Sequence, residues 1–208
     1  MNILLLGATG RVGQVLLKKM LQDGHQVVAL VRSPDKITIE SPQLHLMHGD
    51  VLDVASLEKA LTEMPITAVV SALNTDKNNT LSRSTPALIH LMEQQHIKRL
   101  ITIGTAGILD SRTEPGVYRF QSSESKRRTT TAAEDHLAAY QLLAASDLAW
   151  TVVCPTYLPD GAETGKYRVE ADRLPVDGKE ISVADTAVFA YEQLTSSAYI
   201  GKRVGIAY

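Results

Sequence analysis

The stretch that decides the fold is Asn2-Ile3-Leu4-Leu5-Leu6-Gly7-Ala8-Thr9-Gly10-Arg11-Val12-Gly13. Its apolar run, residues 3–6, predicts a buried strand, and the three glycines predict a tight turn that opens a helix. Because glycine has no Cβ, backbone amides in such a turn can approach a phosphate closely. The unpaired N–H groups and the dipole of the first helical turn favour a negative charge. The order of strand, glycine turn and helix therefore predicts a diphosphate site.

Strand and helix patterns alternate along the rest of the chain. Apolar strands are expected at residues 3–6, 26–31, 44–48, 67–72, 100–103 and 149–154, with a last short strand at 204–207. Helices are expected from residue 12 to the stop at Gly24, at 54–61, at 80–96, at 125–145 as the longest, and from about residue 182. Strands that are apolar throughout are typical of a parallel sheet covered on both faces. We therefore expect an α/β protein, a doubly wound Rossmann fold with a mainly parallel sheet and helices on both faces.

Local signals mark the ends of these helices. Gly24 is placed to end the first helix, Asp53 to cap the second, and the Ser182 to Asp185 spacing predicts a capping box for the last. Pro86 is expected either to kink the third helix or to mark its true start.

Composition limits the possible classes of protein. A chain of 208 residues with 44% hydrophobic and 21% charged residues is ordinary for one globular domain, residues 1–208. Within it, the turn-rich stretch 156–180 is expected to form a lip on the substrate side. A net charge of −2 argues against nucleic-acid binding. No apolar run reaches the roughly 18 residues of a membrane span, and no signal-peptide or metal-ligand pattern is present.

The one cysteine supports a location inside the cell. Cys154 lies in an apolar run, which excludes an internal disulfide and is typical of a buried strand residue rather than a nucleophile. We therefore expect a cytoplasmic protein, as a monomer or a homodimer.

Arginines near two strand ends indicate which nucleotide the turn would hold. A Rossmann protein that prefers NAD usually has an acidic residue after the second strand, to bind the ribose 2′-hydroxyl. Here that strand ends at Arg32, whose guanidinium suits a 2′-phosphate, and Arg11 is expected to reach the same region. The prediction is NADP(H). The alternative is that Arg32 is a solvated surface charge.

Other strand ends supply further candidates for the cofactor site. Asp50 could accept a hydrogen bond from the adenine amino group, or could simply form a turn with Gly49. Asn74 and Thr75 would pass near the adenine ribose and the pyrophosphate. The full set of expected cofactor-binding residues is Gly7, Thr9, Gly10, Arg11, Val12, Gly13, Arg32, Asp50, Val51, Leu73, Asn74, Thr105 and Pro155.

These motifs together resemble a known family. Gly-Ala-Thr-Gly-Arg-Val-Gly at 7–13, Val-Arg-Ser-Pro-Asp-Lys at 31–36, Gly-Asp-Val-Leu-Asp at 49–53 and Gly-Thr-Ala-Gly at 104–107 resemble the atypical short-chain dehydrogenase/reductases. Within them the chain is most similar to the NAD(P)H-binding (NmrA-like) proteins, including the biliverdin reductase B/flavin reductases. The segments 149–155 and 160–168 resemble the C-terminal half of that group. The resemblance implies a Rossmann fold and a nicotinamide cofactor.

The chain departs from the resemblance at the catalytic residues. Conventional members use a Tyr-x-x-x-Lys pair, yet none of the seven tyrosines here has a lysine four residues later. Thr105 stands where the resemblance implies a serine, and Tyr157 where it implies a histidine, which argues against biliverdin as the substrate. Reduction of ordinary ketones, which requires a protein acid, becomes less favourable.

Two residues are the catalytic candidates. Thr105 lies at the strand end nearest the expected nicotinamide, and could bind the carboxamide or the substrate, or only cap a turn. Tyr157 could stack on a flat substrate or merely cover the sheet. His136 is expected to be a structural or surface histidine. The basic run 126–128 is expected to be a solvated face, with attraction of an anionic substrate as the alternative.

The sequence supports two classes of function. The first is an NADPH-dependent oxidoreductase that passes hydride to a planar acceptor such as a flavin or quinone, because such acceptors can take their proton from solvent. The second is a non-catalytic, NADP(H)-sensing regulatory protein, as some NmrA-like proteins are. A nucleotide-sugar epimerase is a distant third, since it would need the Tyr-Lys pair and a larger C-terminal domain.

Overall fold

A sheet of eight strands forms the centre of the computed structural model, which describes residues 1–125 and 129–208. Its strand order is β3-β2-β1-β4-β5-β6-β8-β7, and every neighbouring pair is parallel except β7 and β8. The strands are β1 (Asn2–Leu6), β2 (Gln26–Val31), β3 (Leu44–His48), β4 (Ala68–Ser71), β5 (Arg99–Ile103), β6 (Ala149–Pro155), β7 (Arg168–Ala171) and β8 (Lys202–Ala207).

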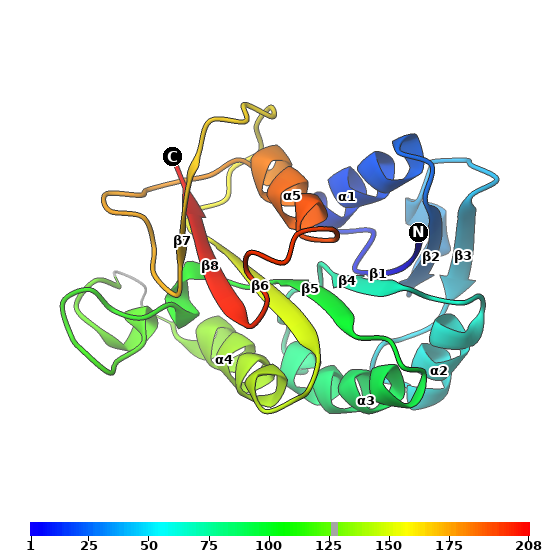
Figure 1. Ribbon diagram of the computed structural model, residues 1–208, viewed down its shortest axis with the longest axis horizontal. Helices are drawn as coiled ribbons and strands as arrows, with labels where there is room; N and C mark the ends of the chain where they lie inside the picture. Colours follow the sequence, from blue (N-terminus) through cyan, green and yellow to red (C-terminus); the bar gives the residue numbers. More distant parts are fainter. Residues whose placement is uncertain (126–128) are drawn as a thin grey trace.

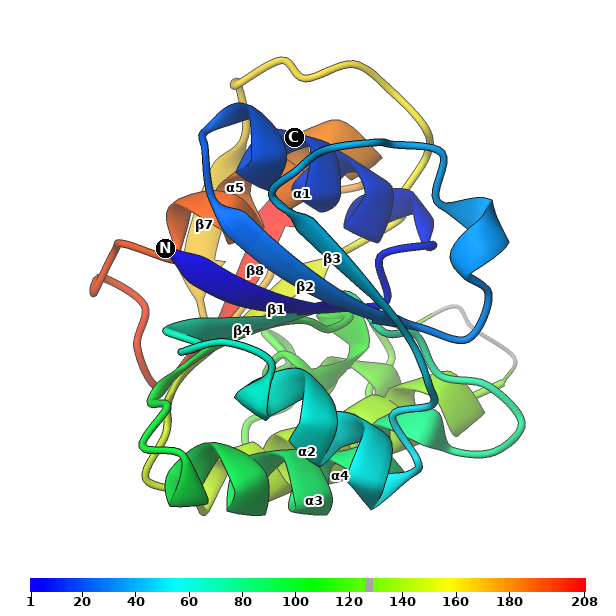
Figure 2. The ribbon, with the colours of Figure 1, turned by 90° about the vertical axis from the view of Figure 1, so that its right-hand side faces the viewer.

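Helices cover both faces of this sheet (Figure 1). On one face lie α1 (Arg11–Gln22) and α5 (Val183–Glu192), which pack against each other. On the other face lie α2 (Val54–Thr62), α3 (Thr80–Gln94) and α4 (Thr131–Ala144), as Figure 2 shows from the side. The predicted doubly wound Rossmann fold is confirmed. Every helix among the described residues is too short or too polar to cross a lipid bilayer.

The apolar run of β1 is explained by burial on both sides. Leu4 and Leu6 point into the core under α2, α3 and α4, whereas Ile3 and Leu5 point into the core under α1 and α5. All four side chains are at most 1% exposed. A strand with two buried faces needs no polar alternation, and this is why the pattern at residues 3–6 identifies a central parallel strand.

The predicted helix ends are confirmed at three positions. Asp53 accepts hydrogen bonds from the amides of Ala55 and Ser56, and Ser182 accepts one from the amide of Asp185. Gly24 follows α1 with a φ of +77°, in the left-handed conformation that glycine adopts most easily.

The structure corrects or narrows three other element predictions. Helix α4 begins at Thr131 rather than residue 125, so α3, with 15 residues, is the longest helix. Pro86 lies inside α3 and does not mark its start; lacking an N–H, it leaves the Ser82 carbonyl without its usual helical donor. The stretch 156–180 is not all turns, because it contains β7, which is held antiparallel to β8 at the sheet edge.

A loop that the sequence patterns do not predict leaves the sheet after β5. A short 3₁₀ helix, η2 (Ala106–Ile108), comes first. We call the residues that follow, 109–125, the excursion loop, and they contain a second short 3₁₀ helix, η3 (Arg119–Gln121). The nearly buried Arg203 of β8 holds its base: Nη1 donates to Ile108 O at 2.5 Å and Nη2 to Asp110 Oδ1 at 2.7 Å. The Arg203 guanidinium also lies over the rings of Tyr118 and Tyr140, 5.5 and 4.7 Å from their centroids.

Candidate functional site

The glycine turn between β1 and α1 is shaped by close backbone packing. Gly7 has a φ of +80°, and a Cβ there would lie 2.6 Å from the backbone of Ala72 at the end of β4. A Cβ on Gly13 would lie 2.1 Å from the Gly7 carbonyl oxygen. Gly10 is less crowded, because its Cβ would lie 3.3 Å from the Gly7 oxygen, a longer distance than the other two. Gly10 also borders an open groove. Gly7 and Gly13 therefore close the turn, and Gly10 keeps the groove free of a side chain.

The N-terminus of α1 is left open toward this groove. Its N-cap, Gly10, provides no side-chain hydrogen bond, whereas α2 and α5 are capped by Asp53 and Ser182. The first-turn amides of α1 therefore retain hydrogen-bonding capacity, and the positive end of the helix dipole adds to it. This arrangement suits an anion such as a diphosphate.

The groove runs along the carboxyl ends of the strands, where β1 and β4 lie side by side. It consists of two hollows, of about 230 and 180 Å³, that share Gly10, Ala72, Leu73 and Asn74. The sheet order reverses at this point, and open α/β sheets bind ligands there. The first hollow is also lined by Gly7, Thr9, Arg32, Asp50 and Val51, and the second by Arg11, Val12 and Pro155. Gly13 lies under the turn rather than in the groove wall.

The described lining of the first hollow, which reaches the end of β2, includes one cation, Arg32, and two carboxylates, Asp50 and Asp76. Arg32 Nη1 lies 4.0 Å from Asp76 Oδ2, and the Arg32 side chain is 67% exposed. Asp76 is held by Thr80, whose hydroxyl and amide both donate to it, and these bonds with that of the Asn78 amide lower the pKa of Asp76. The sequence reading did not consider Asp76. Its carboxylate partly offsets the positive charge that Arg32 offers there.

Arg11 does not join Arg32, contrary to the sequence prediction. Its Nη1 donates to Leu158 O at 2.9 Å and to Asp160 Oδ1 at 3.0 Å, both on the lip. It therefore lines the second hollow and is absent from the hollow that Arg32 lines. The lip supplies two acceptors for the guanidinium, and this explains why the side chain turns that way.

Of the two roles that the sequence left open for Asp50, the structure shows the turn, and the contact with adenine stays a prediction. Its Oδ1 accepts a hydrogen bond from the Leu52 amide at 2.9 Å, so it does form a turn. It also lines the first hollow.

The turn after β4 is fixed by a residue that the sequence reading passed over. Asp135 of α4, 4% exposed, accepts hydrogen bonds from Thr75 Oγ1 and from the Leu81 and Ser82 amides at the start of α3. Burial raises the pKa of Asp135, but these bonds outweigh it and hold the pKa below its usual value. A charged carboxylate therefore caps α3 and holds the Asn74–Thr75 turn.

A third hollow, of about 430 Å³, lies beside the groove and contains both catalytic candidates. Thr105 and Tyr157 line it together with residues of η2, η3 and the lip. Thr105 Oγ1 accepts a 3.3 Å hydrogen bond from the Gly107 amide, so it also caps η2. Tyr157 is 65% exposed. Gly104, the residue before Thr105, lines the groove, so the groove and this third hollow meet at the end of β5.

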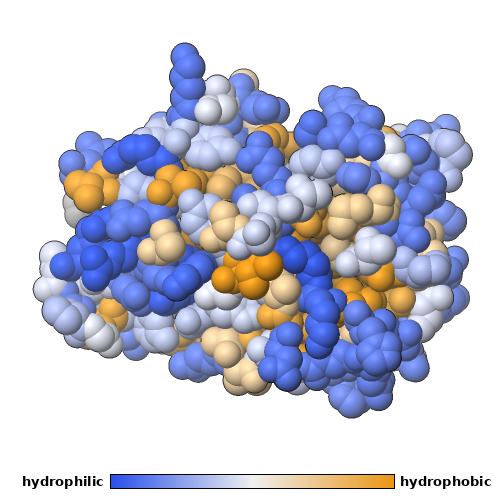
Figure 3. All heavy atoms as spheres, viewed as in Figure 1, coloured by the Kyte–Doolittle hydropathy of each residue, from blue (hydrophilic) through white to orange (hydrophobic). Residues whose placement is uncertain are grey.

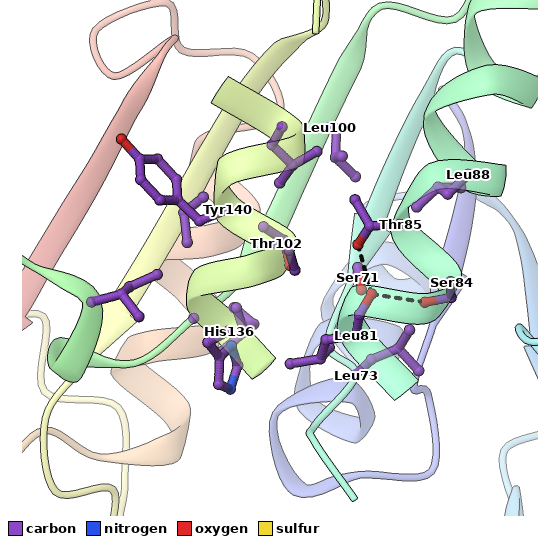
Figure 4. Close-up of a pocket in the computed structure, with 16 residues that line it drawn as sticks. Ser71, Leu73, Leu81, Ser84, Thr85, Leu88, Leu100, Thr102, His136 and Tyr140 are labelled. Atoms are coloured by element: carbon purple, nitrogen blue, oxygen red, sulfur yellow. Dashed lines mark hydrogen bonds between the residues drawn. The ribbon is translucent and has the colours of Figure 1, made fainter. Parts of the chain in front are cut away.

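His136 lies closer to the groove than the sequence prediction of a structural or surface residue implied. It lines the second hollow of the groove and also a small interior pocket between α3, α4 and the sheet (Figure 4). The interior pocket has a volume of about 30 Å³, which is room for about one water molecule. It is too small for an acceptor.

Three further points from the sequence concern Cys154, the basic run 126–128 and metal ligands. Cys154 is fully buried, and burial raises the pKa of its thiol to about 12, so it is not a nucleophile. The basic run 126–128 lies outside the described residues. Among the described residues, no three His, Cys, Asp or Glu side chains come together to hold a metal.

The chain belongs to the NAD(P)H-binding family, because residues 7–197 match the model of that family. The matched range includes the glycine turn, the groove and the third hollow. Membership establishes a nicotinamide nucleotide as the class of ligand but does not distinguish NADP from NAD.

Two proteins match this chain over nearly its whole length. The uncharacterized protein YwnB of Bacillus subtilis (strain 168) is 27% identical, with 98% of this chain and 96% of YwnB covered. A proposed epimerase from Bacteroides thetaiotaomicron is 27% identical, with 100% and 96% coverage and a TM-score of 0.86.

Two further solved structures show the same fold at lower identity. A proposed NADH-flavin reductase from Streptococcus pneumoniae TIGR4 has 24% identity, a TM-score of 0.80, and 100% and 99% coverage. ChuY, an anaerobillin reductase from Escherichia coli O157:H7, has 24% identity, a TM-score of 0.82, and 100% and 97% coverage.

Proposed function

We propose that the protein is an NADPH-dependent reductase that passes hydride to a planar acceptor such as a flavin or quinone. The observation that carries this proposal is the junction at the end of β5, where Gly104 lines the cofactor groove and Thr105 lines the third hollow. A nicotinamide in the groove would then be beside an acceptor in the hollow. The flavin and anaerobillin reductases among the structural neighbours are consistent with such an acceptor.

The chain's own residues provide positioning rather than proton transfer. When bound, the nicotinamide supplies hydride from C4. The α1 amides would hold the diphosphate, Thr105 would hydrogen-bond the carboxamide or the acceptor, and Tyr157 would cover the acceptor ring. A reduced flavin or quinone can take its proton from solvent, so the missing Tyr-Lys pair does not prevent this reaction.

Three further points concern the choice of nucleotide, the location in the cell and a rival function. Arg32 would favour NADPH over NADH through a charge-assisted contact with the 2′-phosphate. A cytoplasmic location is consistent with the single buried cysteine. The epimerase reading receives less support, because none of the seven tyrosines begins a Tyr-x-x-x-Lys pair.

The test is the oxidation of NADPH by the purified protein in the presence of FMN, quinones or aldehydes. We expect turnover with the first two and little with aldehydes, whose reduction needs a proton donor. Tight NADPH binding without reduction of any acceptor would favour the regulatory reading instead. A pull-down with and without NADP⁺ would then search for the protein partner.

A further inference from the structure

Two cationic side chains of the described residues line the third hollow. Arg119 of η3 and Lys179 of the lip both line it, and Glu124 is the one carboxylate among its described lining residues. Hydrophilic residues predominate over the excursion loop, at the left of Figure 3. The hollow is therefore not a purely apolar slot, and its charges need an explanation.

Glu124 is already committed to the excursion loop. Its Oε1 accepts hydrogen bonds from Ser111 Oγ at 2.6 Å and from the amides of Arg112 and Thr113 at 2.5 and 3.3 Å. Burial raises the pKa of Glu124, but these hydrogen bonds outweigh it and keep the pKa lowered. The carboxylate is therefore charged, and it stabilises the turn at residues 111–113.

Arg119 is fixed in place but incompletely paired. Its amide donates to Leu109 O at 2.7 Å, and its carbonyl accepts from Ser122 Oγ at 2.9 Å, so its backbone is anchored. Its Nε is buried and makes no hydrogen bond of good geometry, although Glu124 Oε2 lies 3.4 Å away. A guanidinium has five N–H donors, and among the described residues only this one carboxylate lies beside it.

Lys179 supplies the second positive charge. Its side chain is exposed and forms no ion pair with any described residue. Its carbonyl accepts a 3.4 Å hydrogen bond from Thr156 Oγ1, which fixes the lysine backbone next to Tyr157. With one carboxylate against two cations, the described lining of the hollow has a surplus of positive charge.

We infer that the acceptor carries an oxyanion, a carboxylate or a phosphate, which binds to Arg119 and Lys179 while its planar ring lies between Thr105 and Tyr157. This inference rests on the proposed reductase function, because it assigns the acceptor to the same hollow. An oxyanion would give the Arg119 donors acceptors that the described residues, apart from Glu124, do not provide. The two residues then select acceptors by charge, and Tyr157 selects them by shape.

Matched acceptors can test the charge requirement. FMN and riboflavin share the same ring and differ in the phosphate, and 2-carboxyanthraquinone can be compared with its methyl ester. Binding is measured by flavin fluorescence with NADP⁺ present, where no turnover occurs, and kcat/KM is measured with NADPH. We expect FMN to bind about tenfold tighter than riboflavin, as a charge-assisted contact implies. The pair that shows the larger preference identifies phosphate or carboxylate as the natural oxyanion.

Charge-removing variants locate the site. Arg119→Gln and Lys179→Gln should each weaken FMN binding about three- to tenfold and leave riboflavin binding unchanged. Lys166→Gln is the control, since this exposed lip lysine lines none of the three hollows. If Arg119→Gln fails to fold, the exposed Lys179→Gln still tests the site.

Equal binding of FMN and riboflavin, or variants that affect both alike, would overturn the inference and leave the reductase function intact. If FMN bound more tightly than riboflavin but no NADPH was oxidised, the proposed reductase function would be refuted and the oxyanion site would still be supported.

Discussion

Thr75 Oγ1 donates a 2.5 Å hydrogen bond to Asp135 Oδ2, which joins the turn after β4 to helix α4. The same carboxylate accepts from two amides at the start of α3. One buried charge thus fixes both the N-terminus of α3 and the wall of the cofactor groove at Asn74.

Replacing Asp135 by Asn should therefore lower both stability and nucleotide affinity. The asparagine side chain has no charge, and its NH₂ group would face groups that themselves donate hydrogen bonds. We therefore expect the free energy of unfolding to fall by about 1.5–3 kcal/mol. Urea denaturation measures the stability, and NADPH fluorescence measures the affinity. Glu134→Gln, at the exposed neighbouring position, should cost less than about 1 kcal/mol. Equal effects of the two changes would contradict the assigned role.

The contact between Arg32 and Asp76 leads to a prediction about the preference for NADPH over NADH. We expect NADPH to bind at least about tenfold tighter than NADH, since one charge-assisted contact is worth about 1.5–3 kcal/mol. Arg32→Ala should narrow this ratio. Asp76→Asn should widen it, because it removes the carboxylate 4.0 Å from the guanidinium and keeps an oxygen for Thr80. Equal affinities of the wild-type protein for both nucleotides would refute the assignment.

Gly10 provides a test of the phosphate site. Gly10→Val would put a branched side chain into the groove, and NADPH binding should fall sharply while the far-UV circular dichroism spectrum stays native. Gly10→Ala should have an intermediate effect, since a single Cβ meets the Gly7 oxygen at 3.3 Å. Unchanged binding in the valine variant would show that the diphosphate lies elsewhere.

Thr105 and Tyr157 should affect the reaction differently. Thr105→Ala removes about one hydrogen bond, 0.5–1.5 kcal/mol, so the rate should fall by up to roughly tenfold. Tyr157→Ala should mainly raise the KM for the acceptor, and Tyr157→Phe, which keeps the ring, should restore it. Steady-state kinetics with FMN separates kcat from KM. A fall of roughly 10²–10⁴ in Thr105→Ala would instead indicate loss of a catalytic acid.

His25 should make stability depend on pH. Its Nε2 lies 2.9 Å from Tyr191 Oη, and burial lowers its pKa from the usual value of 6.5. Below about pH 6.5 the unfolded chain then binds a proton that the folded chain does not, so the free energy of unfolding should decrease as the pH falls. Thermal melts from pH 7.5 to 5 would show a smaller decrease in His25→Gln. His90→Gln, at an exposed position of α3, should behave like wild type.

The fold was predictable where a local pattern and a local cause coincide. The residues of β1 are apolar because both faces of the strand are buried, and Gly7 and Gly13 are required by backbone packing within a few residues. The doubly wound parallel topology followed from the general rule for alternating strands and helices, and the helix caps at Asp53 and Ser182 are made within their own first turns.

The missed features depend on contacts between distant parts of the chain. From the sequence, β7 looks like part of a turn-rich segment. It forms a strand because it pairs with β8, which lies more than 30 residues later in the chain. Arg203 supports the excursion loop through Ile108 and Asp110, which no spacing in the sequence relates to it. Arg11 was predicted beside Arg32, but acceptors on the lip, more than 140 positions later, set its direction. A helix of period 3.6 shows which face Asp135 occupies, but not that α3 begins opposite it.

The burial of Cys154 also has a practical consequence. Labelling reagents react with exposed thiolates, and this thiol is both fully enclosed and, with a pKa of about 12, protonated at neutral pH. We therefore expect the native protein not to react with maleimides or iodoacetamides. A cysteine introduced at Lys166, an exposed lip position that lines none of the three hollows, could be modified alone, and a fluorophore or spin label there would report on the lip without changing the site.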